Sequence, residues 1–160
     1  MEKFKYYIKE LIIFIVILTL LMNIVSLYKA DELNKQSLNS IKLNDKNIQL
    51  PKDKPIMIHF WATWCPTCKL EASNIEYISQ KYNVITIAVN SDNIEKYMKK
   101  NNLTFKVIND KDSKLSKLFN ISAYPTTFIY NKNKNLIFNE VGYTSLFGLW
   151  IRMFLADSYS

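Results

Sequence analysis

The chain has 160 residues, of which 49% are hydrophobic and 22% charged, so it can build one packed domain with a short appendage. Its only glycines are Gly142 and Gly148, which excludes a glycine-rich phosphate loop and argues against nucleotide binding. The net charge of +7 comes from scattered lysines and a single arginine, a pattern that indicates a solvated basic surface and argues against nucleic-acid binding.

The first predicted element is an apolar helix near the N-terminus. Residues 11–27 read LIIFIVILTLLMNIVSL and contain no charged side chain. With its flanks, the segment 8–28 reaches the roughly 20 residues that span a bilayer as a helix. Three lysines, Lys3, Lys5 and Lys9, precede the run, and Lys29 follows it. This excess of positive charge on the N-terminal side predicts that the N-terminus lies in the cytoplasm and the rest of the chain outside. No suitable pair of small residues follows the run, which favours an uncleaved single-pass anchor over a removed signal peptide.

The polarity of the sequence divides the chain into three parts. We expect a cytoplasmic tip and membrane anchor over residues 1–30, a polar linker over 31–39 and a folded domain over 40–160. At the start of the domain, residues 40–50 alternate loosely in hydropathy and predict a short hairpin or edge strand. Residues 51–55 carry a proline at each end and form a break.

Short apolar runs and helical spacings alternate through the rest of the domain. Strands are predicted over residues 56–61, 84–89, 105–108, 126–130 and 136–141. Helices are predicted over 66–82, from Asp92 to about 101, over 113–119 and over 144–156. This order predicts an α/β fold with a central mixed β-sheet and helices on both faces.

Individual side chains are assigned within these elements. On the first helix of the domain, Leu70, Ile75 and Ile78 are expected on one face. Trp150 and the other aromatic residues of the last helix are expected in the core. Asp92 is expected to cap the second helix of the domain, and Asp112 or Ser113 the third.

The two cysteines, Cys65 and Cys68, lie where a predicted strand gives way to a helix. Disulfide exchange needs an accessible thiolate with a second thiol near enough to close the bridge. Unpaired N–H groups and the helix dipole stabilise a thiolate at a helix N-terminus. A zinc site would need four ligands, and His59 is the only histidine, so we predict no metal and no cofactor. Catalytic exchange is favoured over a static disulfide.

The segment HFWATWCPTC, followed by Lys69 and Glu71, resembles the thioredoxin-like proteins of the TlpA/DsbE group. The resemblance covers residues 40–156, and Tyr124-Pro125-Thr126 matches the cis-proline loop of that family. It implies a thioredoxin fold, with the proline beside the cysteines where it helps to present the substrate backbone. The family consists of membrane-tethered reductases, many of which serve cytochrome c maturation.

The resemblance also implies where the chain acts and on what. The expected place is a bacterial inner or cell membrane, with the catalytic domain in the periplasm or outside. The expected partners are thiols or disulfides of exported proteins, with apocytochrome c as the substrate class, and a membrane thiol reductant or oxidant. We therefore predict a membrane-anchored disulfide reductase, in which Cys65 attacks the substrate and Cys68 resolves the mixed disulfide.

Two further residues are candidates for proton transfer. His59 lies six residues before Cys65, where thioredoxins often carry a buried aspartate that assists the resolving cysteine. The alternative is a core histidine with a backbone hydrogen bond. Glu71 lies three residues after Cys68, where the family often has an acid that tunes the cysteines, and its alternative is a solvated helix residue. Ser73 stands where family members usually have a helix-kinking proline, which puts the local helix geometry in doubt.

The residues around the cysteines are candidates for substrate binding. Trp64 is expected to be a partly exposed platform beside the cysteines, and Trp61 to be core packing. Tyr124, Pro66 and Thr67 complete the predicted substrate-binding set.

Other functions fit the same motif. A thiol oxidase, an isomerase or a copper-stress redox protein would keep the fold and change the direction of electron flow, and the reduction potential discriminates among these. A non-enzymatic module could bind Cu(I) through the two thiolates. A thiol peroxidase is less well supported, because redoxin peroxidases carry a threonine where this chain has Ala62.

Overall fold

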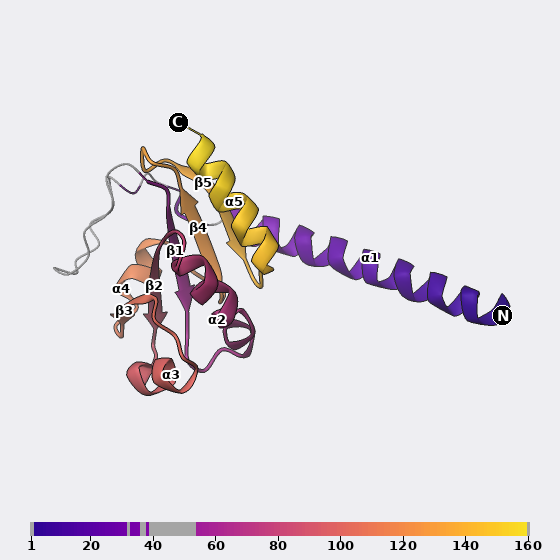
Figure 1. The fold of residues 1–160 in the computed structure, drawn as a ribbon, viewed down its shortest axis with the longest axis horizontal. Coiled ribbons are helices and arrows are strands. Elements are labelled where there is room, and N and C mark those ends of the chain that lie inside the picture. The colour runs from indigo at the N-terminus through magenta and orange to yellow at the C-terminus, as the bar shows by residue number, and fades with distance from the viewer. Residues whose placement is uncertain (1, 32, 36–37, 39–53, 160) are drawn as a thin grey trace.

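The computed structural model describes residues 2–31, 33–35, 38 and 54–159. Over these residues the chain forms a sheet with helices on both faces and one long helix that leaves the domain (Figure 1). The elements, in chain order, are α1 (Glu2–Asp31), β1 (Ile56–Trp61), α2 (Pro66–Ser79), β2 (Asn83–Val89), α3 (Ile94–Lys100), β3 (Lys106–Asp110), α4 (Lys114–Leu118), β4 (Thr126–Tyr130), β5 (Leu136–Val141) and α5 (Leu146–Ser158). The hairpin or edge strand predicted over 40–50 lies outside the described residues.

The sheet is mixed, as the order of elements predicts. Its strand order is β3-β2-β1-β4-β5, with β1, β2 and β3 parallel and β4 antiparallel to both β1 and β5. Every residue of β1 is buried, as expected for a central strand covered on both faces. The parallel pairing brings the carboxyl ends of β1 and β2 to one edge of the sheet.

Alternation along β1 divides the core between the two faces. Met57 and Trp61 point to one face, where Leu149 and Met153 of α5 and the buried side of α2 complete a hydrophobic cluster. Ile56, Ile58 and Phe60 point to the other face, where Phe60 packs against Phe119 and Phe128 with ring centroids 5.0 and 6.0 Å away. α2 and the reactive residues at its start are therefore held on a rigid sheet.

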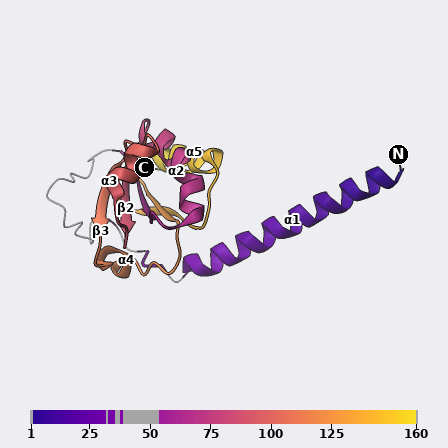
Figure 2. The ribbon, with the colours of Figure 1, turned by 90° about the horizontal axis from the view of Figure 1, so that it is seen from below.

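Helix α1 leaves the domain and extends away from it in both views (Figures 1 and 2). Its last turn is attached to the domain, because Ala30 is buried and its carbonyl oxygen accepts a hydrogen bond from Asn139 of β5 at 2.9 Å. In the expected linker, Leu33 and Leu38 are also buried. Over the part of the chain that is described, no helix combines the length and hydropathy needed to cross a membrane.

Two side-chain assignments made from the sequence are wrong. Leu70 is 73% exposed, because the buried face of α2 is formed by Cys68, Glu71, Ala72, Ile75 and Ile78. Trp150 of α5 is 40% exposed, with Phe147 and Phe154 still more so. Helix α5 is apolar nearly all round, so its hydropathy alone does not identify its buried side.

Of the two predicted helix caps, the one at Asp92 is wrong and the one at Ser113 is at the predicted residue. Asn93, rather than Asp92, is the N-cap residue of α3, and its side chain makes no cap hydrogen bond. Ser113 is the N-cap residue of α4, again without a side-chain cap bond. The carboxylate of Asp110, at the end of β3, accepts the N–H groups of Leu115 and Ser116 instead, at 3.0 and 2.8 Å. An acidic side chain from the preceding strand thus does the work of a cap.

Candidate active site

The two cysteines form a disulfide bond at the start of α2. Cys65 is the N-cap residue, and its Sγ accepts a hydrogen bond from the backbone N–H of Cys68 at 3.1 Å. Pro66 occupies the first turn, where its missing N–H leaves no intrahelical bond unmade. Cys65 and Cys68 are only 4% and 2% exposed, so little of either residue is in contact with solvent.

A loop distant in sequence completes one side of the disulfide. The Tyr124–Pro125 peptide bond is cis, as the family resemblance implies, and Pro125 is buried immediately before β4. Because β4 pairs with β1, this loop lies beside the residues that follow β1. The Sγ atom of Cys65 lies 3.7 Å from the carbonyl oxygen of Tyr124. The loop therefore lies where an incoming chain would approach the reactive sulfur.

Trp64 provides an exposed aromatic surface next to the disulfide. Trp64 is 56% exposed. Its ring contacts that of half-buried Tyr124 edge to face, with centroids 5.8 Å apart. Its indole N–H donates to the carbonyl oxygen of Asn90 at 3.0 Å, which fixes the ring. Pro66 and Thr67, between the two cysteines in the sequence, are exposed and half-buried.

The loop after β2 supports the turn that leads from β1 to the cysteines, and the sequence does not predict this contact. The backbone N–H of Thr63 donates to the Ser91 hydroxyl at 3.0 Å, and that hydroxyl donates to the carbonyl oxygen of Val89 at the same distance. The carboxyl ends of parallel neighbouring strands lie at one edge of a sheet, which is the signal that could have identified Ser91.

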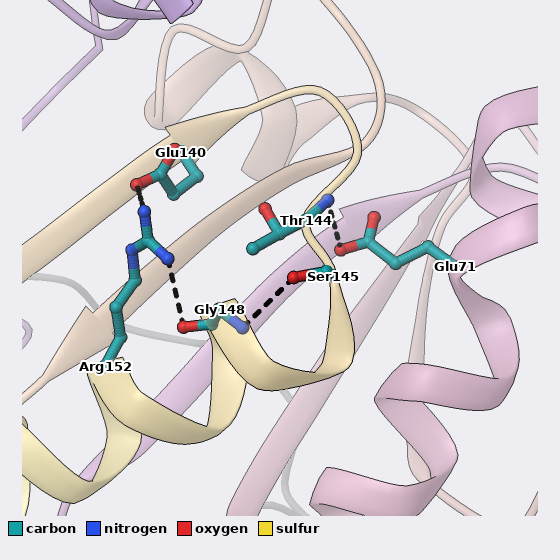
Figure 3. A network of polar contacts seen from close by, with 6 residues as sticks. All are labelled: Glu71, Glu140, Thr144, Ser145, Gly148 and Arg152. Carbon is teal, nitrogen blue, oxygen red and sulfur yellow. Dashed lines mark hydrogen bonds and ion pairs between the residues drawn. The ribbon is translucent and has the colours of Figure 1, made fainter. Parts of the chain in front are cut away.

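Glu71 lies one turn after Cys68 on the buried face of α2. Its residue exposure is 0%, so it is not a solvated helix residue. One carboxyl oxygen accepts the backbone N–H of Thr144 at 3.2 Å (Figure 3), and the other has no hydrogen-bond partner among the described residues. Burial raises the pKa of Glu71 to about 8, against the lowering effect of the Thr144 hydrogen bond. The carboxyl group therefore gains and loses a proton near neutral to mildly alkaline pH.

The segment that holds Glu71 is itself fixed at the start of α5 (Figure 3). The Ser145 hydroxyl accepts the N–H of Gly148 at 3.2 Å and caps the helix. Arg152 donates to the Gly148 carbonyl oxygen at 3.0 Å and pairs with Glu140 of β5 at 2.6 Å. The sequence reading singled out none of these contacts.

His59 lies in the middle of β1, on the face that α2 covers. It is 2% exposed, and its Nδ1 lies 2.9 Å from the hydroxyl oxygen of Thr127, its partner on β4. Burial lowers the pKa of His59 to about 3, so the ring is neutral near pH 7. The alternative prediction for His59 is a hydrogen bond to the backbone, whereas the hydrogen bond seen here goes to the Thr127 side chain.

No group of three or more histidine, cysteine or acidic side chains that could hold a metal ion occurs within the described ranges.

The chain is similar to known proteins in both sequence and structure. Residues 28–138 match the AhpC/TSA family. A thioredoxin-like protein of Haemophilus influenzae is 30% identical over 135 residues, which cover 81% of this chain and 80% of that protein. Sporulation thiol-disulfide oxidoreductase A of Bacillus subtilis is 29% identical over 111 residues, or 62% of this chain and 67% of that protein. The solved structure of a thioredoxin-family thiol:disulfide interchange protein from Chlorobium tepidum superposes with a TM-score of 0.60 at 26% identity, covering 66% of this chain and 81% of that one.

Proposed function

This chain belongs to the AhpC/TSA family and is a thiol–disulfide oxidoreductase, and from that premise we propose that it reduces disulfide bonds in exported proteins. The observation that carries the proposal is the Cys65–Cys68 pair at the start of α2, beside the Tyr124–Pro125 loop and the exposed Trp64. The cysteine pair supplies a reactive sulfur, and the loop and Trp64 supply a neighbouring surface to which a polypeptide can bind.

In the proposed reaction, the chain starts in its dithiol form. The Cys65 thiolate attacks one sulfur of a substrate disulfide, forming a mixed disulfide and releasing the other substrate sulfur as a thiolate. Cys68 then attacks the Cys65 sulfur, which releases the second substrate thiol and leaves the Cys65–Cys68 bridge. Two electrons have passed to the substrate. A membrane thiol reductant restores the dithiol by the same exchange and is itself oxidised.

The cysteines need a helix start and a proton acceptor for this cycle. The first-turn N–H groups of α2 stabilise a thiolate on Cys65. We assign to Glu71 the role of accepting a proton when Cys68 becomes the attacking group, because the carboxyl is buried one turn away and titrates near the working pH. His59 would act as a neutral hydrogen-bonding group in the core beneath α2.

The substrate would lie across Trp64, Tyr124, Pro66 and Thr67, with its backbone against the loop at Pro125. Apocytochrome c is the substrate class that the family resemblance implies. Its two heme-attachment cysteines must be reduced before heme is joined, which is a disulfide reduction of the kind proposed.

We propose that residues 8–28 attach the chain to the bacterial inner or cell membrane. The N-terminal tip would lie in the cytoplasm and the catalytic domain in the periplasm or outside. The support is the uncharged run over 11–27 and the exposed apolar side chains of α1, which include Leu11, Phe14, Leu18 and Leu21. Recovery of the full chain in carbonate-washed membranes is expected, and its release by carbonate would contradict the anchor.

The proposed exchange is tested by trapping partners in the native membrane. With Cys68→Ala, the mixed disulfide on Cys65 cannot be resolved, so substrate proteins should accumulate on Cys65 and be released by a reductant. Cys65→Ala is the matched control and should trap none of them. Disulfide exchange would be contradicted if Cys68→Ala captured nothing beyond this control and the cysteine pair of the unsubstituted chain did not cycle in cells.

The direction of electron flow is tested by the reduction potential. A value near the ~−270 mV of thioredoxin supports a reductase, whereas a value near ~−120 mV would indicate an oxidase. Turnover in an insulin-reduction assay separates both from a module that only binds Cu(I), which would show tight metal binding without turnover.

A further inference from the structure

Helix α5 exposes a continuous aromatic face. It buries Leu149, Met153 and Ala156 against the domain, and on its other side Phe147 is 68% exposed and Phe154 is 52% exposed. The ring of Trp150 stacks between them, with centroids 6.3 Å from Phe147 and 5.8 Å from Phe154. Single exposed apolar residues are ordinary, but a contiguous patch of this kind marks a surface that meets an apolar partner.

This aromatic face of α5 (Phe147, Trp150, Ile151 and Phe154) carries no unbalanced charge. Arg152 is the only charged residue between Leu146 and Ala156. Its guanidinium points away to Glu140 of β5, with which it pairs at 2.6 Å (Figure 3). The whole chain carries a net charge of +7, so the neutrality of this face is local. A partner that recognises the face must do so through apolar contact.

We propose that the aromatic face of α5 lies in the interfacial layer of a lipid bilayer. The described apolar side chains of α1 between Leu11 and Val25 are also exposed. The last turn of α1 is attached to the face of the sheet opposite α5, but α5 lies on the half of the domain towards which α1 extends (Figures 1 and 2). One apolar phase can then cover both helices. Exposed Tyr143 and Tyr159 flank α5 at its two ends, where ring and hydroxyl suit the boundary between hydrocarbon and water.

The inference rests on the proposed membrane attachment and adds an orientation to it. The α5 helix packs against α2, so contact of α5 with lipid would hold the Cys65–Cys68 pair at a defined height and angle above the membrane. A substrate would then have to present its disulfide close to the membrane surface.

The test uses the full chain in nanodiscs made with ordinary or with brominated phosphatidylcholine, whose bromine atoms quench nearby tryptophan. Trp61 is buried in the domain, so the variants Trp150→Phe and Trp64→Phe separate the two exposed tryptophans. Brominated lipid should quench the unsubstituted chain and Trp64→Phe, and Trp150→Phe should lose most of that quenching. A double variant, Phe147→Ser with Phe154→Ser, keeps Trp150 but makes the face less apolar, and it should reduce the quenching of Trp150.

Other outcomes overturn the inference. Equal quenching in Trp150→Phe and the unsubstituted chain places Trp150 away from lipid. In brominated nanodiscs, Trp150 could be shielded from acrylamide and yet not be quenched by bromine. If the chains are then also cross-linked to one another by a chemical reagent, the face belongs to an interface with a second copy of this chain. If the chain does not co-elute with nanodiscs, the anchor proposal fails as well; if it co-elutes and Trp150 is unquenched, the inference on α5 fails alone.

Discussion

Glu71 is a carboxyl group that folding removes from water almost completely. A single backbone N–H, from Thr144, satisfies one of its oxygens. The folded-state pKa of about 8 stands above the ordinary value of 4.5, so folding favours the protonated form. The stability gained from this is complete below pH 4.5 and is lost as the pH rises towards 8.

Replacement of Glu71 by glutamine should therefore stabilise the fold at alkaline pH. The side chain keeps its shape and an oxygen for Thr144 but has no charge to bury. The difference in unfolding free energy between Glu71→Gln and the unsubstituted chain should grow from pH 4.5 to pH 8 and reach about 2–4 kcal/mol. Urea unfolding across this pH range measures it, and a difference that does not vary with pH would refute the assignment.

Glu76 offers a control of opposite sign on the same helix. Its carboxylate accepts three hydrogen bonds from Thr104 and Phe105, which lower its pKa despite partial burial. The stability it contributes is present above its ordinary pKa and is lost in acid. Glu76→Gln should thus destabilise the chain at neutral pH, where Glu71→Gln does not.

Exchange activity should separate a tuning role of Glu71 from a purely structural one. If Glu71 accepts a proton from Cys68, Glu71→Gln should flatten the pH profile of insulin reduction around pH 8. A parallel profile at a uniformly lower rate would show that the residue acts only on structure.

His59 makes the folded chain sensitive to acid. Its folded-state pKa of about 3 lies below the ordinary 6.5, so its contribution to stability is complete above pH 6.5 and is lost as the pH falls towards 3. The pair His59→Leu with Thr127→Val removes both hydrogen-bonding partners and should weaken this acid destabilisation. The slope of unfolding free energy against pH in this range is the measurement, and an unchanged slope would contradict the assignment.

At the scale of the element, α4 depends on a side chain outside it. Asp110 is buried and accepts two N–H groups from the first turn of α4. Asp110→Ala should cost about 1–2 kcal/mol of unfolding free energy, and Asp110→Asn less because one acceptor remains. Within the described residues, the side chain of Asp112 forms an exposed ion pair with Lys114 at 3.4 Å, so Asp112→Ala should change stability by less than about 0.5 kcal/mol. Equal losses for the two alanine variants would exclude the capping role.

Elements with a clear local pattern could be predicted from the sequence. The bounds of β1, β4 and β5 agree with the prediction because these are short runs rich in β-branched and aromatic residues between turn residues. Ser113 is a predicted cap residue, but the acceptor of the first-turn N–H groups of α4 could not be predicted, because Asp110 reaches them from the preceding strand. The exposed side of α5 could not be predicted either, because its apolar residues occur on all sides and only packing selects the buried ones.

The candidate site likewise contains residues that the sequence predicts and contacts that it does not. Cys65, Cys68 and the loop at Pro125 follow from motifs with a known structural context. The contact of Glu71 with Thr144 joins residues 73 positions apart, and that of Thr63 with Ser91 joins residues 28 apart. Such contacts depend on strand pairing and helix packing, for which no local pattern exists.

For the whole molecule, redox state and stability are linked. Reduction and unfolding form a thermodynamic cycle, and strongly oxidising members of this fold owe their potential to a stabilised reduced form. A reductase should show the reverse. We expect the oxidised chain to have a higher urea midpoint than the dithiol chain, and the opposite order would contradict the proposed direction of electron flow.

Cys65 is both the reactive residue of the proposed exchange and the N-cap residue of α2. Its sulfur exchanges bonds with the substrate, and the same sulfur accepts the N–H of Cys68 at the start of α2. A thiolate is a stronger acceptor than a disulfide sulfur. The Cys68 amide proton should therefore change its chemical shift and exchange rate with every turnover, so that a single NMR resonance would report the redox state of the chain without an attached label.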